Sequence, residues 1–152
     1  MARELLFMKA INEALDMAMA KDDKIILLGE DIAGGVKVKH LEEQNEEAWG
    51  GVMGVTSGLM AKYSRDRVID TPLSEHGYMS ASVGMALTGL HPVPELMFND
   101  FIGFCFDALI GQGSKMRYMF GGKAKVPMTV RTMHGAGASA AAQHSGSYYG
   151  IF

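Results

Sequence analysis

Residues 67–77 read Arg67-Val68-Ile69-Asp70-Thr71-Pro72-Leu73-Ser74-Glu75-His76-Gly77. The short apolar run at the start of this segment predicts a strand, and the small residues that follow the proline turn predict a helix. Glu75 lies where that helix should begin. A carboxylate between an apolar strand and an apolar helix should be partly desolvated, and desolvation disfavours its charged form. Glu75 is therefore a candidate for proton exchange, although a helix-capping role explains its position equally well.

Strands and helices alternate on both sides of this junction. The apolar periodicity predicts helices over residues 4–20, 58–64, 77–89 and 100–118, and strands over 24–29, 67–70, 92–97 and 125–131. Residues 30–54 are polar and predict a long loop. This order favours an α/β fold with a mainly parallel sheet flanked by helices. We expect one domain spanning residues 1–152.

Composition excludes several classes of protein. Of the 152 residues, 48% are hydrophobic and 20% are charged, which is typical of a globular domain. A formal net charge of -3 argues against a nucleic-acid partner. The apolar runs fall well short of the roughly 20 residues that a membrane span needs. The first residues lack the pattern of a signal peptide, so we expect a cytoplasmic protein. Cys105, the single cysteine, lies in an apolar segment and should be a buried thiol.

Four acidic residues follow predicted strands. Ligands of open parallel sheets gather beyond the carboxyl ends of the strands. Glu30, Asp31, Glu75 and Asp100 could therefore share one rim of the sheet. Their pattern alone fits solvated loop acids and helix caps somewhat better.

The segment 135–140 matches the G-x-G-x-x-A form of a dinucleotide turn. The motif normally follows the first strand of its domain, so a flexible loop is the better interpretation here. His144 lies among small residues and could act as an acid or base near neutral pH, or could be a structural histidine. Met97 and Phe101 fit core positions better than a stacking surface. No zinc-type spacing of Cys and His is present, so no metal site is predicted.

Several motifs in a fixed order resemble one known family. They are Leu27-Leu28-Gly29-Glu30-Asp31, segment 67–75, Gly84-Met85-Ala86-Leu87-Thr88-Gly89-Leu90, Pro94-Glu95-Leu96-Met97 and Ala142-Gln143-His144-Ser145. Together they resemble the beta subunit of the thiamine-diphosphate-dependent 2-oxoacid dehydrogenase first component. Segments 49–56, 98–101 and 115–123 are most similar to the acetoin dehydrogenase branch. Pyruvate and branched-chain 2-oxoacid dehydrogenases are the alternatives within the family.

The resemblance implies a transketolase-like pyrimidine-binding domain and assigns residue roles. Glu75 would hydrogen-bond the aminopyrimidine ring of thiamine diphosphate and share a proton with it. Met97 and Phe101 would pack against that ring. His144 would lie near the reacting centre, where it would help proton transfer or position the substrate. Glu30 would lie close to the cofactor.

The resemblance also implies partners. Thiamine diphosphate would be shared with an alpha subunit that holds Mg2+, and a second beta subunit and a lipoyl acyltransferase core would complete the assembly. Family beta subunits are about twice this length, so we expect the N-terminal part of such a subunit, without its C-terminal domain and inactive alone. The charged segment 34–47 is expected to alter a subunit contact. Two functions of other classes stay open: a non-catalytic dinucleotide-binding module and a structural assembly domain.

Overall fold

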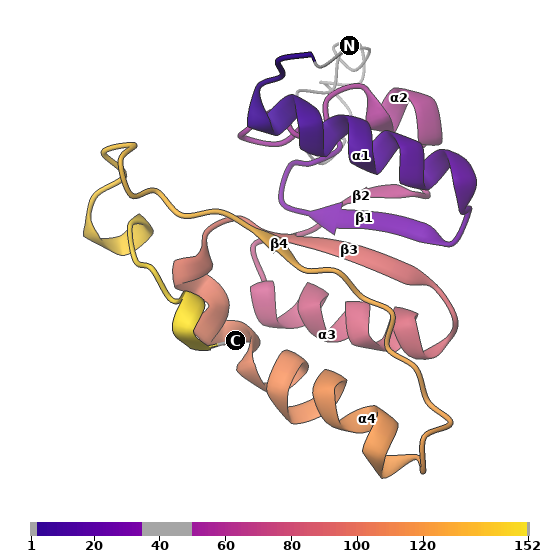
Figure 1. Ribbon diagram of the computed structural model, residues 1–152. Coiled ribbons are helices and arrows are strands. Elements are labelled where there is room, and N and C mark those ends of the chain that lie inside the picture. Colours follow the sequence, from indigo (N-terminus) through magenta and orange to yellow (C-terminus); the bar gives the residue numbers. More distant parts are fainter. Residues whose placement is uncertain (1–2, 35–49, 152) are drawn as a thin grey trace. The chain divides into compact units, whose positions relative to one another are not determined.

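The computed structural model describes residues 3–34 and 50–151, and the chain divides into two compact units (Figure 1). The N-terminal unit extends to Pro72, and the C-terminal unit begins at Leu73. The expectation about segment 34–47 lies almost entirely outside the described residues, as does Trp49.

The N-terminal unit is a parallel strand pair with two helices. Its elements are α1 (Phe7–Lys21), β1 (Ile25–Gly29), α2 (Leu59–Tyr63) and β2 (Val68–Asp70). β1 pairs in parallel with β2, and Leu27 is opposite Val68. All five residues of β1 are buried, as its unbroken apolar run predicts. Both helices lie on the same side of the two strands (Figure 1).

Polar contacts join the elements of this unit. The Asp16 carboxylate on α1 accepts hydrogen bonds from Lys62 Nζ and from the Tyr63 hydroxyl, each at 2.6 Å. These bonds lower the pKa of Asp16, with the Lys62 bond as the larger cause. The Arg67 guanidinium donates to the carbonyls of Met19 and Asp22, at 3.1 and 2.7 Å, and so holds the turn between α1 and β1.

The C-terminal unit has a second parallel pair and a long helical segment. Its elements are α3 (Glu75–Leu87), β3 (His91–Leu96), η2 (Asn99–Cys105), η3 (Asp107–Gly113), α4 (Ser114–Met119), β4 (Arg131–Thr132), η4 (Ala142–His144) and η5 (Tyr149–Ile151). β3 pairs in parallel with β4, where Glu95 is opposite Arg131 and the two side chains form an ion pair. α3 packs against β3, η2 and η3.

Small residues let α3 approach its neighbours closely. Met79, Ser82, Val83 and Ala86 are buried on this helix. A Cβ added to Gly113 of η3 would lie 3.5 Å from Val83 Cγ2 and 3.2 Å from the Ala108 carbonyl. The distance to Val83 is an ordinary van der Waals contact, so Gly113 of η3 lies directly against α3. The helix predicted from the small residues of this segment is confirmed.

The prediction of an α/β fold is confirmed, and every strand pair described within a unit is parallel. Cys105 is fully buried, as expected. Two element predictions were wrong. The segment 100–118 is not one α-helix but a 3₁₀ helix, a π-helix and a short α-helix in succession. The strand predicted over 125–131 is extended chain that joins the ladder only at Arg131 and Thr132. Pro127 lacks the N–H that a longer ladder would need.

Candidate functional site

Glu75 is the first residue of α3, and Ser74 is the N-cap. A carboxylate in the first helical turn is favoured by the partial positive charge at the helix N-terminus. Glu75 is half-buried, which agrees with the expected partial desolvation. α3 packs against η2, which contains Cys105. Burial raises the pKa of the Cys105 thiol to about 11, and the charge of Glu75 adds to this shift. His76 Nδ1 also donates to the Phe104 carbonyl at 3.2 Å and ties the start of α3 to η2.

Three rings gather beside η2. The His144 ring meets Phe98 and Phe101 edge to face, with centroid distances of 4.5 and 5.4 Å. The two phenylalanines meet each other at 6.2 Å in the same geometry. Edge-to-face contacts of this kind stabilise a pair by about 0.5–1.5 kcal/mol. The structure thus brings the predicted residues Phe101 and His144 together. Met97 directly precedes Phe98, whose ring contacts the rings of both residues.

The loop that follows His144 is fastened to the start of η2. Asn99 is buried, its Nδ2 donates to the Gly146 carbonyl at 3.0 Å, and its Oδ1 accepts from Tyr148 N at 3.2 Å. Asp100 Oδ1 accepts from Gly146 N at 2.9 Å. Asn99 N also donates to the Met133 carbonyl at 2.7 Å. We call Asn99, Asp100 and their bonds to residues 146–148 the η2 clamp.

Two glycines near His144, one before it and one after it, lie in close contacts. Gly135 N donates to the His144 carbonyl at 2.7 Å, and a Cβ added to Gly135 would lie 2.4 Å from that oxygen. A Cβ added to Gly146 would lie 2.7 Å from Asp100 Oδ1. The contact at Gly135 is with backbone, so the position of the His144 loop depends on this glycine, whereas a Cβ at Gly146 would require the Asp100 and Tyr148 side chains to shift.

Two buried polar atoms beside this cluster have no hydrogen-bond partner among the described residues. One is Asp100 Oδ2 and the other is His134 Nδ1. The His134 ring meets Tyr149 edge to face at 5.6 Å. An unpaired buried acceptor is costly, and such an atom is commonly satisfied by a ligand, a water or a partner chain. The site therefore still offers an acceptor beside the three rings.

Glu30 belongs to the N-terminal unit, directly after β1, and is buried. The turn that carries it is held by Asp70, whose Oδ1 accepts from Ala33 N at 2.6 Å and whose Oδ2 pairs with Arg65 at 3.2 Å. Asp31 in the same turn has a positive φ of 56°. Backbone strain of this kind is found preferentially at functional sites.

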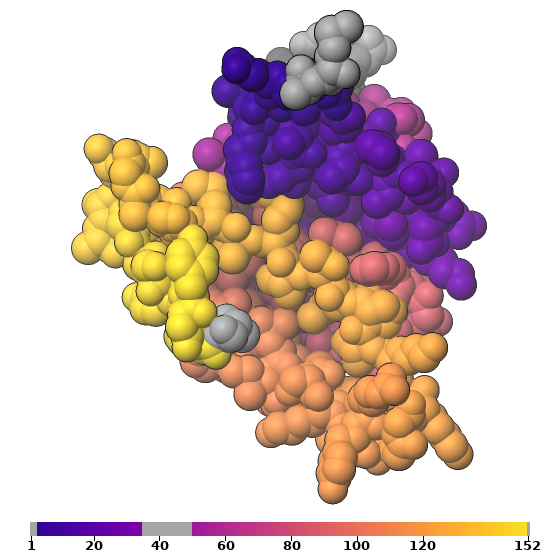
Figure 2. All heavy atoms as spheres, in the orientation of Figure 1, coloured from indigo at the N-terminus to yellow at the C-terminus, as the bar shows by residue number. Residues whose placement is uncertain are grey.

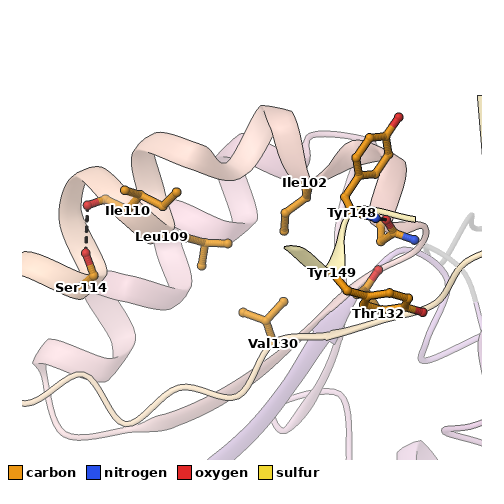
Figure 3. A pocket seen from close by; sticks show the side chains of 9 residues that line it. Ile102, Leu109, Ile110, Ser114, Val130, Thr132, Tyr148 and Tyr149 are labelled. Carbon is orange, nitrogen blue, oxygen red and sulfur yellow. Dashed lines mark hydrogen bonds between the residues drawn. The ribbon is translucent and has the colours of Figure 1, made fainter. Parts of the chain in front are cut away.

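An apolar cavity of about 360 Å³ lies next to the η2 clamp (Figure 3). Ile102, Leu109 and Val130 point into it, and Tyr149 borders it. Asn99 of the clamp is also part of its wall. Its described wall contains no lysine or arginine, so the cavity suits an apolar group and not a phosphate.

The dinucleotide interpretation of residues 135–140 is wrong. These residues form turns, and the next element is the three-residue 3₁₀ helix η4. A dinucleotide motif needs the N-terminus of an α-helix at this point. Sequence reasoning gave Asn99 no role, although it lies in segment 98–101, which carries part of the family resemblance.

Two negative observations apply to residues 3–34 and 50–151. No group of three or more metal-ligating side chains lies within this part of the chain. None of its helices is both long enough and apolar enough to cross a membrane.

Comparison with known proteins places these features in a family. The family model described as "Transketolase, pyrimidine binding domain" matches residues 3–152. The chain is 62% identical over its full length to the Acetoin:2,6-dichlorophenolindophenol oxidoreductase subunit beta of Bacillus subtilis, of which it covers 44%. It is 54% identical over 95% of its length to the subunit of the same name from Cupriavidus necator, of which it covers 41%.

A more distant relative is the Pyruvate dehydrogenase E1 component subunit beta of Acholeplasma laidlawii, which is 38% identical over 93% of the chain. The chain covers 39% of that protein, so it spans less than half the length of each of these three relatives. The family model, in contrast, is matched over nearly the whole chain. On this basis the chain belongs to the transketolase pyrimidine-binding domain family.

Proposed function

We propose that this chain supplies the pyrimidine-binding half of a thiamine diphosphate site, as the N-terminal part of the beta subunit of an acetoin or 2-oxoacid dehydrogenase first component. The observation that supports this most is the arrangement around η2. A half-buried carboxylate at the start of α3 and a cluster of three aromatic rings both lie against this one short element.

The residues present fit an aminopyrimidine ring. A planar heterocycle packs well against the edges and faces of Phe98 and Phe101. Its ring nitrogen and amino group need a carboxyl group and a hydrogen-bond acceptor. Glu75 offers the first, and the unpaired Asp100 Oδ2 is a buried acceptor on the same 3₁₀ helix as Phe101. We assign Met97 to packing against the ring, and Glu30 to a supporting position near the cofactor.

In this proposal Glu75 holds a proton at a ring nitrogen of the pyrimidine and returns it during turnover. Partial burial keeps water from competing for that proton. His144, oriented by its aromatic neighbours, exchanges a proton with the substrate or positions it. Thiamine diphosphate, when bound, acts as the electron sink for cleavage beside the substrate carbonyl. The contribution of this chain is orientation and proton control.

Acetoin is the first candidate substrate, because the two relatives of highest identity quoted above carry acetoin in their names. Pyruvate is the second candidate, on the strength of the more distant pyruvate dehydrogenase subunits. A branched-chain 2-oxoacid is the third, and it rests on the sequence resemblance alone.

The assembly belongs to the same proposal. The relatives are named as subunits, and this chain covers 44% or less of those quoted. We infer an alpha subunit that holds Mg2+ and the diphosphate, a second beta subunit and a lipoyl acyltransferase core, in the cytoplasm. The chain forms the single pyrimidine-binding domain, and a C-terminal domain of the beta subunit would complete the protein.

The test is turnover by the full-length beta subunit mixed with its alpha subunit. We expect acetoin-dependent reduction of 2,6-dichlorophenolindophenol that requires thiamine diphosphate. Glu75→Gln keeps the shape of the side chain and removes its acidic proton, so kcat should fall by about 10²–10⁴-fold. An exposed control, Glu4→Gln on the N-terminal unit, should retain full activity. Unchanged activity of Glu75→Gln would refute the role assigned to Glu75.

A further inference from the structure

One ion pair in the C-terminal unit is largely buried. Glu95 of β3 is 9% exposed, and the side chain of its partner, Arg131 of β4, is 20% exposed. Burial lowers the pKa of Arg131 to about 10, so the guanidinium still carries its charge at neutral pH. A buried ion pair adds little net stability, because desolvation of the two charges offsets their attraction. Stability alone therefore does not explain two charges at this position.

The ladder that contains this pair is short. β3 and β4 pair at two positions, Glu95 with Arg131 and Leu96 with Thr132, and residues 123–130 before β4 are extended chain. In the space-filling view these residues form a band of yellow-orange spheres along the surface of the unit (Figure 2). A ladder of two pairs has few main-chain bonds with which to select its register.

Main-chain bonding leaves a second register open. Side chains alternate along a strand with a period of two, so a shift of β4 by two residues keeps every side chain on its face. Before the ladder, Thr129 N donates to the Pro92 carbonyl at 3.2 Å. A shift in one direction would put Pro127 in the place of Thr129, and proline has no N–H to donate. A shift in the other direction would put Arg131 N there, and the bond would be kept.

The ion pair opposes this second shift. It would place Met133 opposite Glu95 and carry Arg131 about 7 Å along the sheet. Arg131 is the only charged residue between positions 126 and 133, so no neighbour could take its place. A buried carboxylate that loses its partner is strongly unfavourable. The observed register is thus the one in which Glu95 and Arg131 lie opposite each other.

The register of β4 determines what the following residues contact. Met133 comes directly after β4, and its carbonyl accepts from Asn99 N of the η2 clamp at 2.7 Å. Two residues further on, Gly135 N donates to the His144 carbonyl at 2.7 Å. A two-residue shift would move both groups by about 7 Å and break both bonds. The position of the His144 loop therefore depends on the register of β4.

We propose that Glu95 and Arg131 are positioning residues of the site, because their ion pair selects the β4 register that places His144. They act through Met133 and Gly135. The expected effect on turnover rests on the proposed function. The expected effect on the loop does not, since it follows from the contacts of the chain itself.

The test replaces the pair in the full-length beta subunit by Glu95→Met combined with Arg131→Met. Two apolar side chains leave no buried charge unpaired, so the urea midpoint should equal that of wild type or exceed it. Hydrogen exchange of the Asn99 amide should nevertheless accelerate about tenfold or more, because the register is no longer selected. The amide of Thr71, which donates to the Gly29 carbonyl at 2.9 Å in the N-terminal unit, should exchange as in wild type.

Turnover with the alpha subunit is the second readout. The Glu95/Arg131 variant should lose about 10²-fold in kcat, because a misplaced His144 no longer meets the substrate correctly. Arg131→Lys keeps a cation beside Glu95 and should retain both the slow exchange of Asn99 and most of the activity. Arg3→Met combined with Glu13→Met removes an exposed ion pair and should change neither readout.

Several results would overturn the proposal. One is wild-type exchange of Asn99 in the Glu95/Arg131 variant, and another is equal acceleration at Thr71 with a lower urea midpoint, which is the result of a merely stabilising pair. Faster exchange of Asn99 with unchanged kcat, or an Arg131→Lys variant as impaired as the double variant, would also overturn it. Unchanged turnover in Glu75→Gln would refute the proposed function instead, and would leave the exchange of Asn99 to decide this inference.

Discussion

At the scale of single residues, position in an element decides which acids can serve the site. Glu75 and Asp100 each lie at the first turn of a helix, and both are half-buried. Asp31 follows a strand too, but its side chain is exposed. A position after a strand is therefore not sufficient to bury an acid.

Cys105 allows a prediction about pH. Burial, with a smaller contribution from the charge of Glu75, raises the pKa of this thiol from 9.0 to about 11. At pH 8 the native chain should hold about a hundredfold fewer thiolates than a free cysteine, and only the thiolate is alkylated. Alkylation by iodoacetamide should therefore be about a hundredfold slower in the native chain than in urea. Equal rates would contradict the burial of Cys105.

The same pKa shift affects stability. The unfolded thiol loses its proton near pH 9, whereas the folded thiol keeps it until about pH 11. The contribution of Cys105 to the free energy of unfolding is complete below pH 9 and is lost as the pH rises through 11. Denaturant titrations of wild type and Cys105→Ala should therefore converge across this range.

At the scale of elements, the short 3₁₀ helix η2 organises the site. It contacts α3, β3 and η4, and it carries Phe101 and both residues of the η2 clamp. The loop of His144 is held against it from residues that are more than 40 positions away in sequence. The position of His144 is thus a property of this packing and of Gly135.

A substitution tests this dependence. Gly135→Ala would place a Cβ 2.4 Å from the His144 carbonyl and should displace the loop. We expect a loss of about 1–3 kcal/mol in the free energy of unfolding, measured in urea, together with reduced activity in the assembled enzyme. Gly150→Ala is the matched control, because its added Cβ would meet no atom within 4 Å. Equal stability of the two variants would show that the loop does not need Gly135.

The element scale also shows what periodicity can and cannot predict. The strands over 25–29, 68–70 and 91–96 were predicted from short apolar runs, and burial on both faces explains that signal for 25–29 and 91–96. The helix type of residues 99–119 was not predicted, since the 3₁₀ and π segments have only seven residues each, too few for their periods to be told from that of an α-helix. The contact between Phe101 and His144 is a long-range one, and no local pattern encodes it. Only the resemblance to a known family pointed to both residues.

At the scale of the whole molecule, the proposed function makes this chain one of two contributors to the cofactor site. The pyrimidine-binding family match extends over residues 3–152, while the quoted relatives are more than twice as long. Within the described residues, no group of ligating side chains could hold a metal ion. In the proposed enzyme, the diphosphate and its Mg2+ would be held by the alpha subunit. Cofactor affinity should therefore be a property of the assembly.

Binding of thiamine diphosphate tests this account most directly. Calorimetry in the presence of Mg2+ would compare the full-length beta subunit alone, the alpha subunit alone and their mixture. We predict tight binding only in the mixture, and weaker binding when the beta subunit carries Glu75→Gln. Binding by the beta subunit alone with the same Kd as the mixture, or no binding by an assembled mixture, would contradict the central claim.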